Sequence, residues 1–535
     1  MSRSNRIRVW GACLWWLAVV AFVSTPAMAD VSLPHVFGSN MVLQRDREVP
    51  VWGWADPNGE VDVRFGVHQV RTKANADGNW TVKLPAMPAG GPFELVVRGK
   101  NTIRFENVLV GEVWVCSGQS NMAWSVSRAA NAQQEIEAAK FPKIRFLTVP
   151  HKLAGEPASD VDVKWEPCSP QTAGEFSAVA YYFGRELHQK LDVPIGLINT
   201  SWGGTSIEPW TPAVGFVLSP KLKKYLEEID LADRKYKAAV RDQVDKVQKW
   251  VAAAREALAR NAAVPPMPVW PEHPLVAAGT KAPSAMFNAM VNPLIPFGIR
   301  GAIWYQGEAN VIANDGMLYH EKMKALIAGW RGLWGQGDFP FYYVQLAPFR
   351  YQGMRAMPGA PTRLPGIWEA QLATLSVPNT GMVVTTDIGD LDDIHPKNKQ
   401  EVGRRLALWA LAGTYGRKDV VCSGPLFKSM TIQNNRIRVE FDYVGGGLVS
   451  RDDKPLTWFQ VAGEDRKFVD AQAVIDGDAV VVVSPAVPRP IAVRFGWHEE
   501  AQPNLMNREG LPLSLIHISE PTRLLSISYA VFCLK

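Results

Sequence analysis

One stretch decides the fold of this chain: Gly111-Glu112-Val113-Trp114-Val115-Cys116-Ser117-Gly118-Gln119-Ser120-Asn121-Met122. The apolar run from Val108 to Cys116 predicts a buried strand, followed by a tight turn of small residues and a polar segment that can open a helix. Ser120 at that junction projects from the strand end, and its backbone N–H lies at a helix N-terminus, where negative charge is stabilised. Taken alone, the pattern also fits an ordinary Ser/Asn helix cap, so its meaning depends on the downstream sequence.

The chain has 535 residues, which is too many for one hydrophobic core, so we expect roughly two to four domains. The apolar content of 47% and the charged content of 20% are typical of a globular protein, and the net charge of +5 is mild. We therefore expect no nucleic-acid binding. Nothing in the sequence pairs the cysteines outside the first 29 residues, and their spacing fits no zinc pattern: Cys116, Cys168, Cys422 and Cys533.

Residues 1–29 predict a secretory signal peptide. Three arginines precede an apolar core from Trp10 to Val23, and the small-residue pattern Ala27-Met28-Ala29 comes next as a cleavage site. The apolar run is short for a membrane span. We therefore expect an exported protein, periplasmic or extracellular, with no integral membrane segment after cleavage.

Two parts of the chain predict β-structure. Residues 30–105 alternate apolar and polar side chains between turns such as Asp56-Pro57-Asn58-Gly59, and residues 420–513 show the same alternation. We interpret the first part as a small β-sandwich that packs against the rest of the chain, with sugar binding as the alternative. We interpret the second part as another β-domain.

Between them, residues 106–416 predict an α/β domain with a mostly parallel sheet, because short apolar strands alternate with longer helical stretches. The predicted strands are Val108–Cys116, Val193–Asn199, Ile299–Tyr305, Phe339–Leu346 and Gly381–Thr386. Sheets of this kind hold their chemistry at the carboxyl ends of the strands.

Two segments depart from these patterns. Residues 219–285 contain apolar residues that step by three and four from Tyr236 to Leu258, which predicts an amphipathic helix, followed by a Pro-rich exposed loop. We interpret this segment as an insertion, a helical bundle packed on the core. Residues 514–535 match no preceding pattern, so we expect a non-native tail that packs poorly, with a genuine terminal strand as the alternative.

Four polar stretches lie at or directly after predicted strand ends: Gly118-Gln119-Ser120-Asn121-Met122, Asn199-Thr200-Ser201-Trp202-Gly203-Gly204-Thr205-Ser206-Ile207-Glu208, Trp304-Tyr305-Gln306-Gly307-Glu308-Ala309-Asn310 and Asp387-Ile388-Gly389-Asp390-Leu391-Asp392-Asp393-Ile394-His395-Pro396. Serine hydrolysis needs a nucleophile, a base that takes its proton, an acceptor that orients the base, and preorganised donors for the oxyanion, each worth roughly 3 kcal/mol. Ser120, His395 and an aspartate of the fourth stretch fill the first three parts. N–H groups of Ser120, Gly204 and Gln306 fill the last.

In this order, the four stretches resemble the blocks of SGNH-type (GDSL-like) hydrolases and, within them, the sialate O-acetylesterase family. The resemblance extends over nearly the whole chain after the expected signal peptide and ends near Leu513. It implies an α/β fold with a three-layer SGNH-hydrolase (flavodoxin-like) core and a mostly parallel sheet, flanked by N- and C-terminal β-sandwich-like domains. It also implies a secreted carbohydrate O-acetylesterase that forms a serine acyl-enzyme and needs no metal or other cofactor.

The resemblance also implies a role for individual residues. Ser120 is expected to be the nucleophile, His395 the general base, and N–H groups of Ser120, Gly204 and Gln306 the oxyanion hole. Many SGNH enzymes carry an aspartate three residues before the histidine, which is Asp392 here, and this spacing lets one loop present both groups. Other candidates for this acid remain open: Asp393, Asp390, Asp387 and Glu308.

Several side chains are candidates for substrate contact. Aromatic faces stack on sugar rings, and Trp202 is the best candidate for such a contact, whereas most other tryptophans near these stretches are expected in the core. Asn121 and Glu308 are further candidates. Arg350 and Arg363 lie after the fourth predicted strand, and either could bind a substrate carboxylate, although a solvated loop arginine is the ordinary case.

We therefore predict a carboxylic ester hydrolase that removes acetyl groups from an O-acetylated sugar or glycan. One alternative keeps the chemistry and changes the substrate, as an acetylxylan-type esterase that acts on plant polysaccharide. Another alternative is a non-catalytic carbohydrate-binding protein on a hydrolase scaffold. The presence of both Ser120 and His395 argues against this second alternative.

Overall fold

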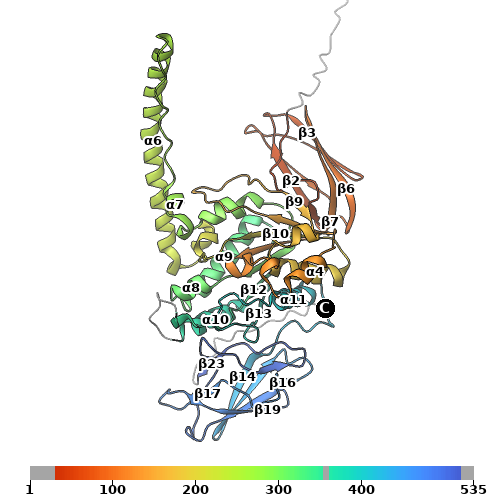
Figure 1. Ribbon diagram of the computed structural model, residues 1–535, viewed down its shortest axis with the longest axis vertical. Coiled ribbons are helices and arrows are strands. Elements are labelled where there is room, and N and C mark those ends of the chain that lie inside the picture. Colours follow the sequence, from red (N-terminus) through yellow and green to blue (C-terminus); the bar gives the residue numbers. More distant parts are fainter. Residues whose placement is uncertain (1–29, 354–360, 520–535) are drawn as a thin grey trace, which may run out of the picture.

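The computed structural model describes residues 30–353 and 361–519. A β-rich region from the N-terminal part lies at one end, an α/β region lies in the middle, and a second β-rich region from the C-terminal part lies at the other end (Figure 1). The fold is mixed α/β, with a large and mostly parallel central sheet and additional β-sheets. The expected signal peptide, residues 1–29, lies outside the described residues.

One long strand, β7 (Thr102–Gly118), joins the first two regions. Its first half pairs antiparallel with β6 (Gly90–Arg98) and lies beside β1 (Val42–Gln44). Its second half pairs parallel with β10 (Ile195–Ser201) and β11 (Gly301–Tyr305). Every residue from 108 to 118 is buried, which accounts for the continuous apolar run in the sequence.

The central sheet has the strand order β13-β12-β11-β7-β10-β8-β9. Its remaining strands are β8 (Ile144–Thr148), β9 (Trp165–Pro167), β12 (Phe341–Val344) and β13 (Thr380–Val383). Every neighbouring pair is parallel except β8 and β9. The chain leaves β10 on one side of β7 and returns as β11 on the other side, and ligand sites of open α/β sheets occur at such crossovers.

Helices pack around this sheet in two groups, α4 with α11, and α9 with α5 and α10. The α-helices are α1 (Ser120–Ala123), α2 (Ala132–Glu137), α3 (Pro170–Ala173), α4 (Ala178–Leu191), α5 (Ala213–Phe216), α6 (Lys223–Ala259), α7 (Pro274–Ala277), α8 (Glu308–Ile312), α9 (Leu318–Trp334), α10 (Arg363–Ala373) and α11 (Lys399–Trp409). Helices α1 and α8 begin at residues of the predicted site, Ser120 and Glu308, and α11 begins four residues after His395.

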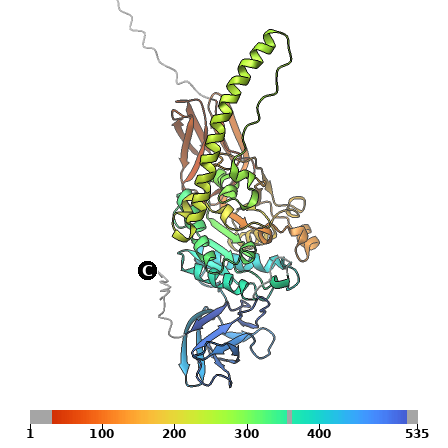
Figure 2. The same ribbon diagram turned by 90° about the vertical axis from the view of Figure 1, so that its left-hand side faces the viewer.

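The predicted helical bundle of the insertion is wrong. The apolar periodicity belongs to one helix of 37 residues, α6, which projects away from the body of the molecule (Figures 1 and 2). The Pro-rich segment returns along the helix, and the indole N–H of Trp250 donates to the carbonyl of Pro265. The periodicity marks the face that this segment covers near Trp250, but Val244 and Leu258 stay exposed.

Alternating strands build the N-terminal β-rich region: β2 (Val49–Trp54), β3 (Glu60–Phe65), β4 (His68–Lys73) and β5 (Asn79–Leu84). Strands β4, β3, β6 and β7 pair antiparallel in that order, and β2 pairs with β5. On β3 the buried side chains are Val61, Val63 and Phe65, so the period of two in the sequence marks the inner face.

Three small sheets make up the C-terminal β-rich region. Their strands are β14 (Leu426–Gln433), β15 (Arg436–Asp442), β16 (Leu448–Ser450), β17 (Phe459–Ala462), β18 (Val469–Asp470), β19 (Gln472–Asp476), β20 (Ala479–Val483), β21 (Ala492–Phe495), β22 (Leu505–Asn507) and β23 (Ile516–Ser519). The pairing is antiparallel throughout these sheets.

The expectation that the chain packs poorly from Ser514 onward is wrong for its first six residues. Strand β23 pairs with β21, and Leu515 and Ile516 are buried. The hydroxyl of Ser514 donates to the side-chain carbonyl of Gln345, 2.7 Å away. Residues 520–535 lie outside the described residues, so the prediction that the tail is non-native stays a prediction.

The cysteines of the described ranges are free. Cys116 and Cys168 are buried, and Cys422 is half-buried, whereas Cys533 lies outside these ranges. In the same ranges, no helix combines the length and the apolar character that a membrane span requires.

Candidate active site

The three neighbouring strand ends meet at Gly118. In the sheet register this residue pairs with Ser201 of β10 and with Tyr305 of β11, so the first three polar stretches leave the sheet side by side. A Cβ atom at Gly118 would lie 2.1 Å from the carbonyl oxygen of Tyr305, and its φ of +142° also requires glycine. Helix α1 begins two residues later at Ser120.

The fourth stretch reaches Ser120 from farther away, because β13 lies three positions from β7 in the sheet. The segment between β13 and α11 crosses back over the strand ends and carries His395. Its Nε2 atom lies 2.9 Å from Oγ of Ser120, within hydrogen-bond distance. The predicted nucleophile and base are therefore in contact.

The predicted acid does not contact His395. The carboxylate of Asp392 accepts a hydrogen bond from Arg350 at 2.5 Å and is mostly exposed. Its neighbour Asp393 lies instead beside the imidazole, with Oδ1 3.4 Å from Nδ1 of His395, and the same oxygen accepts the backbone N–H of His395 at 2.9 Å. The structure therefore differs from the spacing rule by one residue, because the loop turns Asp392 outward.

The other acid candidates also have partners of their own. Asp387 forms a bidentate ion pair with Arg405 of α11. Asp390 accepts the backbone N–H groups of Asp392 and Asp393 and so shapes the loop. Neither carboxylate faces the imidazole of the base.

The surroundings of His395 favour its neutral form. Burial lowers the pKa of His395 below its ordinary value, and the positive charges of Lys399 and Arg128 lower it further, whereas Asp393 opposes this shift. The imidazole also stacks on the indole of Trp124, with the ring centroids 4.7 Å apart. A neutral imidazole can accept the serine proton.

Two backbone N–H groups are available at the serine. Among the described residues, no group accepts a hydrogen bond from the N–H of Ser120 or of Gly204. The segments that carry these two N–H groups lie close together, because a Cβ atom at Gly203 would lie 3.3 Å from Cβ of Ser120. Gly203 and Gly204 are both exposed, so a substrate can reach this part of the site.

The structure differs from the prediction for Gln306. Its side-chain Nε2 donates to Oε1 of Gln119 at 3.0 Å, to the carbonyl of Thr205 at 3.2 Å and to Oδ1 of Asn310 at 2.7 Å. A primary amide has only two hydrogens, and these three acceptors engage both of them. The side chain is fully buried, so Gln306 joins the residue before Ser120 to the residue after Gly204 instead of facing a substrate.

Two further residues expected to contact substrate are also buried. Asn121 and Glu308 are 2% and 3% exposed, and Nδ2 of Asn121 donates to Oε1 of Glu308 at 2.5 Å. Lys399, at the start of α11, donates to Oδ1 of Asn121. The sequence pattern assigned neither Lys399 nor Trp124 a role in positioning His395. No local signal identifies Lys399, since it opens α11 four residues after His395, which lies in the loop before that helix.

Trp202 keeps part of its surface open. Its indole stacks on the imidazole of His151, with centroids 4.2 Å apart and 7° between the planes. Most of the other tryptophans near the site are buried, as expected: Trp114, Trp124, Trp210, Trp304 and Trp368. Trp202 therefore stays the best aromatic candidate for a sugar contact.

The two loop arginines already have protein partners. Arg350 pairs with Asp392 and lies 3.5 Å from Glu500 in the C-terminal β-rich region. Arg363, at the start of α10, donates to the carbonyl of Ile312. A substrate carboxylate would have to compete with these contacts.

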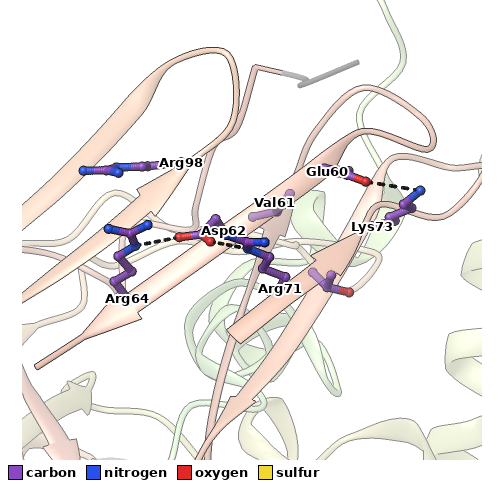
Figure 3. Close-up of a pocket in the computed structure, with 8 residues that line it drawn as sticks. Glu60, Val61, Asp62, Arg64, Arg71, Lys73 and Arg98 are labelled. Atoms are coloured by element: carbon purple, nitrogen blue, oxygen red, sulfur yellow. Dashed lines mark hydrogen bonds and ion pairs between the residues drawn. The ribbon is translucent and has the colours of Figure 1, made fainter. Parts of the chain in front are cut away.

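A hollow of about 610 Å³ lies elsewhere, on the N-terminal β-rich region (Figure 3). It is lined by Glu60, Val61, Asp62, Arg64, Arg71, Thr72, Lys73 and Arg98. Arg64 and Arg71 both bond the carboxylate of Asp62, at 3.0 and 2.8 Å. This hollow contains paired surface charges and none of the groups of the Ser120 site. Across the described residues, no cluster of three or more His, Cys, Asp or Glu side chains could hold a metal ion.

Comparisons with known proteins match the chain to one family of carbohydrate esterases. The sequence profile of the sialic acid-specific acetylesterase family matches residues 110–253 and 280–412. Sialate O-acetylesterase from Rattus norvegicus is 31% identical over 472 residues, which cover 80% of this chain and 82% of that protein. The protein of the same name from Homo sapiens is 29% identical over 523 residues, which cover 90% of each chain.

A solved structure is also similar. The crystal structure of a protein from Xanthomonas citri, described as a novel carbohydrate acetylesterase, has a TM-score of 0.77 and 34% sequence identity, and the match covers 92% of this chain and 100% of that one. The family profile therefore matches more than half of this chain, and the relatives match most of it. The protein is a carboxylic ester hydrolase acting as a carbohydrate O-acetylesterase, and it belongs to the sialic acid-specific acetylesterase family of carbohydrate esterases.

Proposed function

We propose that the protein hydrolyses acetyl esters of sugars through an acyl-enzyme formed on Ser120, with His395 as the general base. The observation that carries this proposal is the 2.9 Å contact between Oγ of Ser120 and Nε2 of His395 at the crossover of the central sheet. A serine hydroxyl is a weak nucleophile until a base takes its proton, and a contact of this length provides the base.

The reaction proceeds in two steps. Oγ of Ser120 attacks the acetyl carbonyl while His395 takes the hydroxyl proton, and the N–H groups of Ser120 and Gly204 stabilise the oxyanion. The intermediate collapses when His395 returns the proton to the leaving sugar oxygen, which leaves acetyl-Ser120. His395 then takes a proton from water, the hydroxide attacks the acetyl carbonyl, and acetate leaves as the proton returns to Ser120. Asp393 orients the imidazole and stabilises its charged form.

O-acetylated sialic acid is our proposed substrate class within the acetylated sugars. The sequence relatives carry this activity in their name, and the family profile has the same description. Half-buried Trp202 offers an aromatic face to a sugar ring beside the exposed Gly203 and Gly204. Acetylated sialic acid and acetylated xylan, assayed side by side for acetate release, distinguish this substrate class from the plant-polysaccharide alternative.

The architecture and location of the protein are also part of the proposal. We assign the central region to a three-layer SGNH-hydrolase core at residues 106–416, flanked by β-domains at 30–105 and 420–513, with the insertion at about 219–285. The parallel sheet with Ser120 at its crossover supports this assignment. We also propose export to the periplasm or cell exterior, on the signal-peptide pattern of residues 1–29.

The test is acetate release from an aryl acetate by the wild type, Ser120→Ala and His395→Ala. We expect each variant to lower kcat on the order of 10⁴-fold or more, because the two residues act as a unit. Ser376→Ala and His68→Ala are matched controls away from the site and should keep wild-type rates. Full activity in a folded Ser120→Ala protein would contradict the proposal. A chain cut after Ser519 keeps β23 and tests whether residues 520–535 affect turnover.

A further inference from the structure

A buried polar cluster lies behind the pair of Ser120 and His395. Its members are Asn121 on α1, Glu308 on α8 and Lys399 on α11, which are 2%, 3% and 0% exposed. Burying polar and charged groups is unfavourable unless they are paired. The hydrogen bonds among these side chains and to their neighbours therefore have to offset the unfavourable free energy of burying them.

The amide of Asn121 bonds to three other segments of the chain. Its Nδ2 donates to Oε1 of Glu308 at 2.5 Å and to the carbonyl of Ile394 at 3.0 Å, and its Oδ1 accepts a hydrogen bond from Nζ of Lys399. The orientation of the amide is determined by its partners, because its oxygen faces the cation and its nitrogen faces the two acceptors. The amide thus forms a hydrogen bond with each of three atoms: Oε1 of Glu308, the carbonyl oxygen of Ile394 and Nζ of Lys399.

Two of these contacts connect the neighbours of the reacting residues. Asn121 directly follows Ser120, and Ile394 directly precedes His395, so the 3.0 Å bond joins the nucleophile helix to the loop of the base. Lys399 begins the helix that comes after this loop. The cluster therefore lies where a small displacement changes the distance between Oγ and Nε2.

We propose that Asn121 is a positioning residue that holds the His395 loop against the Ser120 helix, and that Lys399 and Glu308 hold its amide in the orientation this bond requires. The proposal rests on the proposed function of Ser120 and His395. None of the three side chains touches the reacting atoms.

The electrostatics of the cluster agree with this geometry. Burial raises the pKa of Glu308 and lowers the pKa of Lys399 to about 7, so burial disfavours the charged form of each group. The charged groups that face Lys399 are Glu308 and Asp393, and the rings of Trp124 and Tyr305 lie 5.8 and 5.3 Å from its ammonium. The charged groups that face His395 are Lys399, Asp393 and Arg128.

The first test compares Asn121→Ala with the wild type on an aryl acetate. We expect kcat to fall roughly 10- to 100-fold with KM changed by less than about threefold, since a misplaced base affects the chemical step more than binding. Glu308→Ala should act in the same direction, whereas Glu308→Gln keeps an oxygen acceptor for the amide and should recover most of kcat. Wild-type kcat in a folded Asn121→Ala protein would overturn the proposal.

The second test is the pH profile of Lys399→Met, which also decides the matter if Asn121→Ala fails to fold. The cation of Lys399 disfavours protonation of His395, so its removal should move the acid limb of kcat/KM to higher pH and lower kcat. Lys397→Met is the matched control, because Lys397 is exposed two residues away and its removal should move neither quantity. A lower melting temperature with unchanged kcat and an unchanged pH profile would show that the cluster only stabilises the fold.

The two proposals fail in different ways. If Ser120→Ala and His395→Ala keep activity, the proposed function is wrong. If both lose activity while Asn121→Ala and Lys399→Met retain wild-type kcat and pH profiles, only the positioning role is wrong.

Discussion

The imidazole of His395 stacks on the indole of Trp124, with ring centroids 4.7 Å apart and 19° between the planes. The guanidinium of Arg128 also lies over the Trp124 ring, 3.6 Å from its centroid, and the indole N–H donates to the carbonyl of Arg128. Both contacts with Arg128 therefore hold the indole of Trp124 in place. It restricts the rotation of an imidazole that must point at Oγ of Ser120.

Replacement of Trp124 should therefore impair the base. We expect Trp124→Leu to lower kcat roughly tenfold or more and Trp124→Phe to lower it less, because phenylalanine keeps a flat face for the imidazole. Steady-state kinetics on an aryl acetate measure both. Trp458→Leu is a matched control, since Trp458 stacks on His498 in the C-terminal β-rich region. Equal losses in Trp124→Leu and Trp458→Leu would point to general destabilisation.

The two neighbouring aspartates should differ in their effect on catalysis. Asp393 lies 3.4 Å from Nδ1 of His395, whereas Asp392 is paired with Arg350. We expect Asp393→Asn to lower kcat/KM roughly 10- to 100-fold, because the orienting carboxylate is lost, and Asp392→Asn to change it less than about twofold. The reverse order in kinetic measurements would restore Asp392 as the acid.

Gln306 can either brace the backbone around Ser120 or donate a hydrogen bond to the oxyanion, and one substitution distinguishes these two roles. If it braces Gln119 and Thr205, Gln306→Glu should lower both the melting temperature and kcat, because a carboxylate cannot donate to the buried oxygens, each lost bond being worth about 1–3 kcal/mol. If the side chain donated to the oxyanion directly, kcat would fall while the melting temperature stayed near the wild-type value. Thermal unfolding and kinetics on the same samples separate the two cases.

The activity should persist below the ordinary pKa of histidine. The proposed base, His395, can accept the serine proton only in its neutral form, so we expect kcat/KM to rise with pH through the pKa of His395 in the free enzyme. Burial and the charge of Lys399 lower this pKa, so the midpoint of the acid limb should lie below roughly pH 6.5. A pH–rate profile over the acid range measures it, and a midpoint clearly above this value would contradict the environment described for His395.

A buried ion cluster should contribute to stability. Lys322 of α9 is 1% exposed and pairs with Glu208 and Asp315. We expect Lys322→Met to destabilise the protein by about 3–5 kcal/mol, because it leaves two buried carboxylates without their cation. Lys324→Met on the same helix is the matched control, since Lys324 is half exposed and should change the stability little. Denaturant unfolding of both variants provides the comparison.

The main elements and the proximity of Ser120 and His395 could be predicted from the amino-acid sequence. The apolar run before Gly118 predicted β7 because a strand in the middle of a parallel sheet is buried on both faces. Ser120 and His395 were identified from residue types at strand ends, since parallel strands bring their carboxyl ends to one edge. These signals are local, and local backbone preference is what a sequence pattern records.

Which of several equivalent side chains meet depends on the folded chain. Asp392 and Asp393 are adjacent and chemically the same, and the distant Arg350 turns one outward while the other lies beside His395. The apolar periodicity of α6 predicted a helix with one covered face, but it did not indicate that a single returning segment, and not a helical bundle, contacts that face. Gln306 and Lys399 became structural partners of the site because residues far apart in the chain bury them. Long-range packing decides such contacts, and no spacing along the chain encodes it.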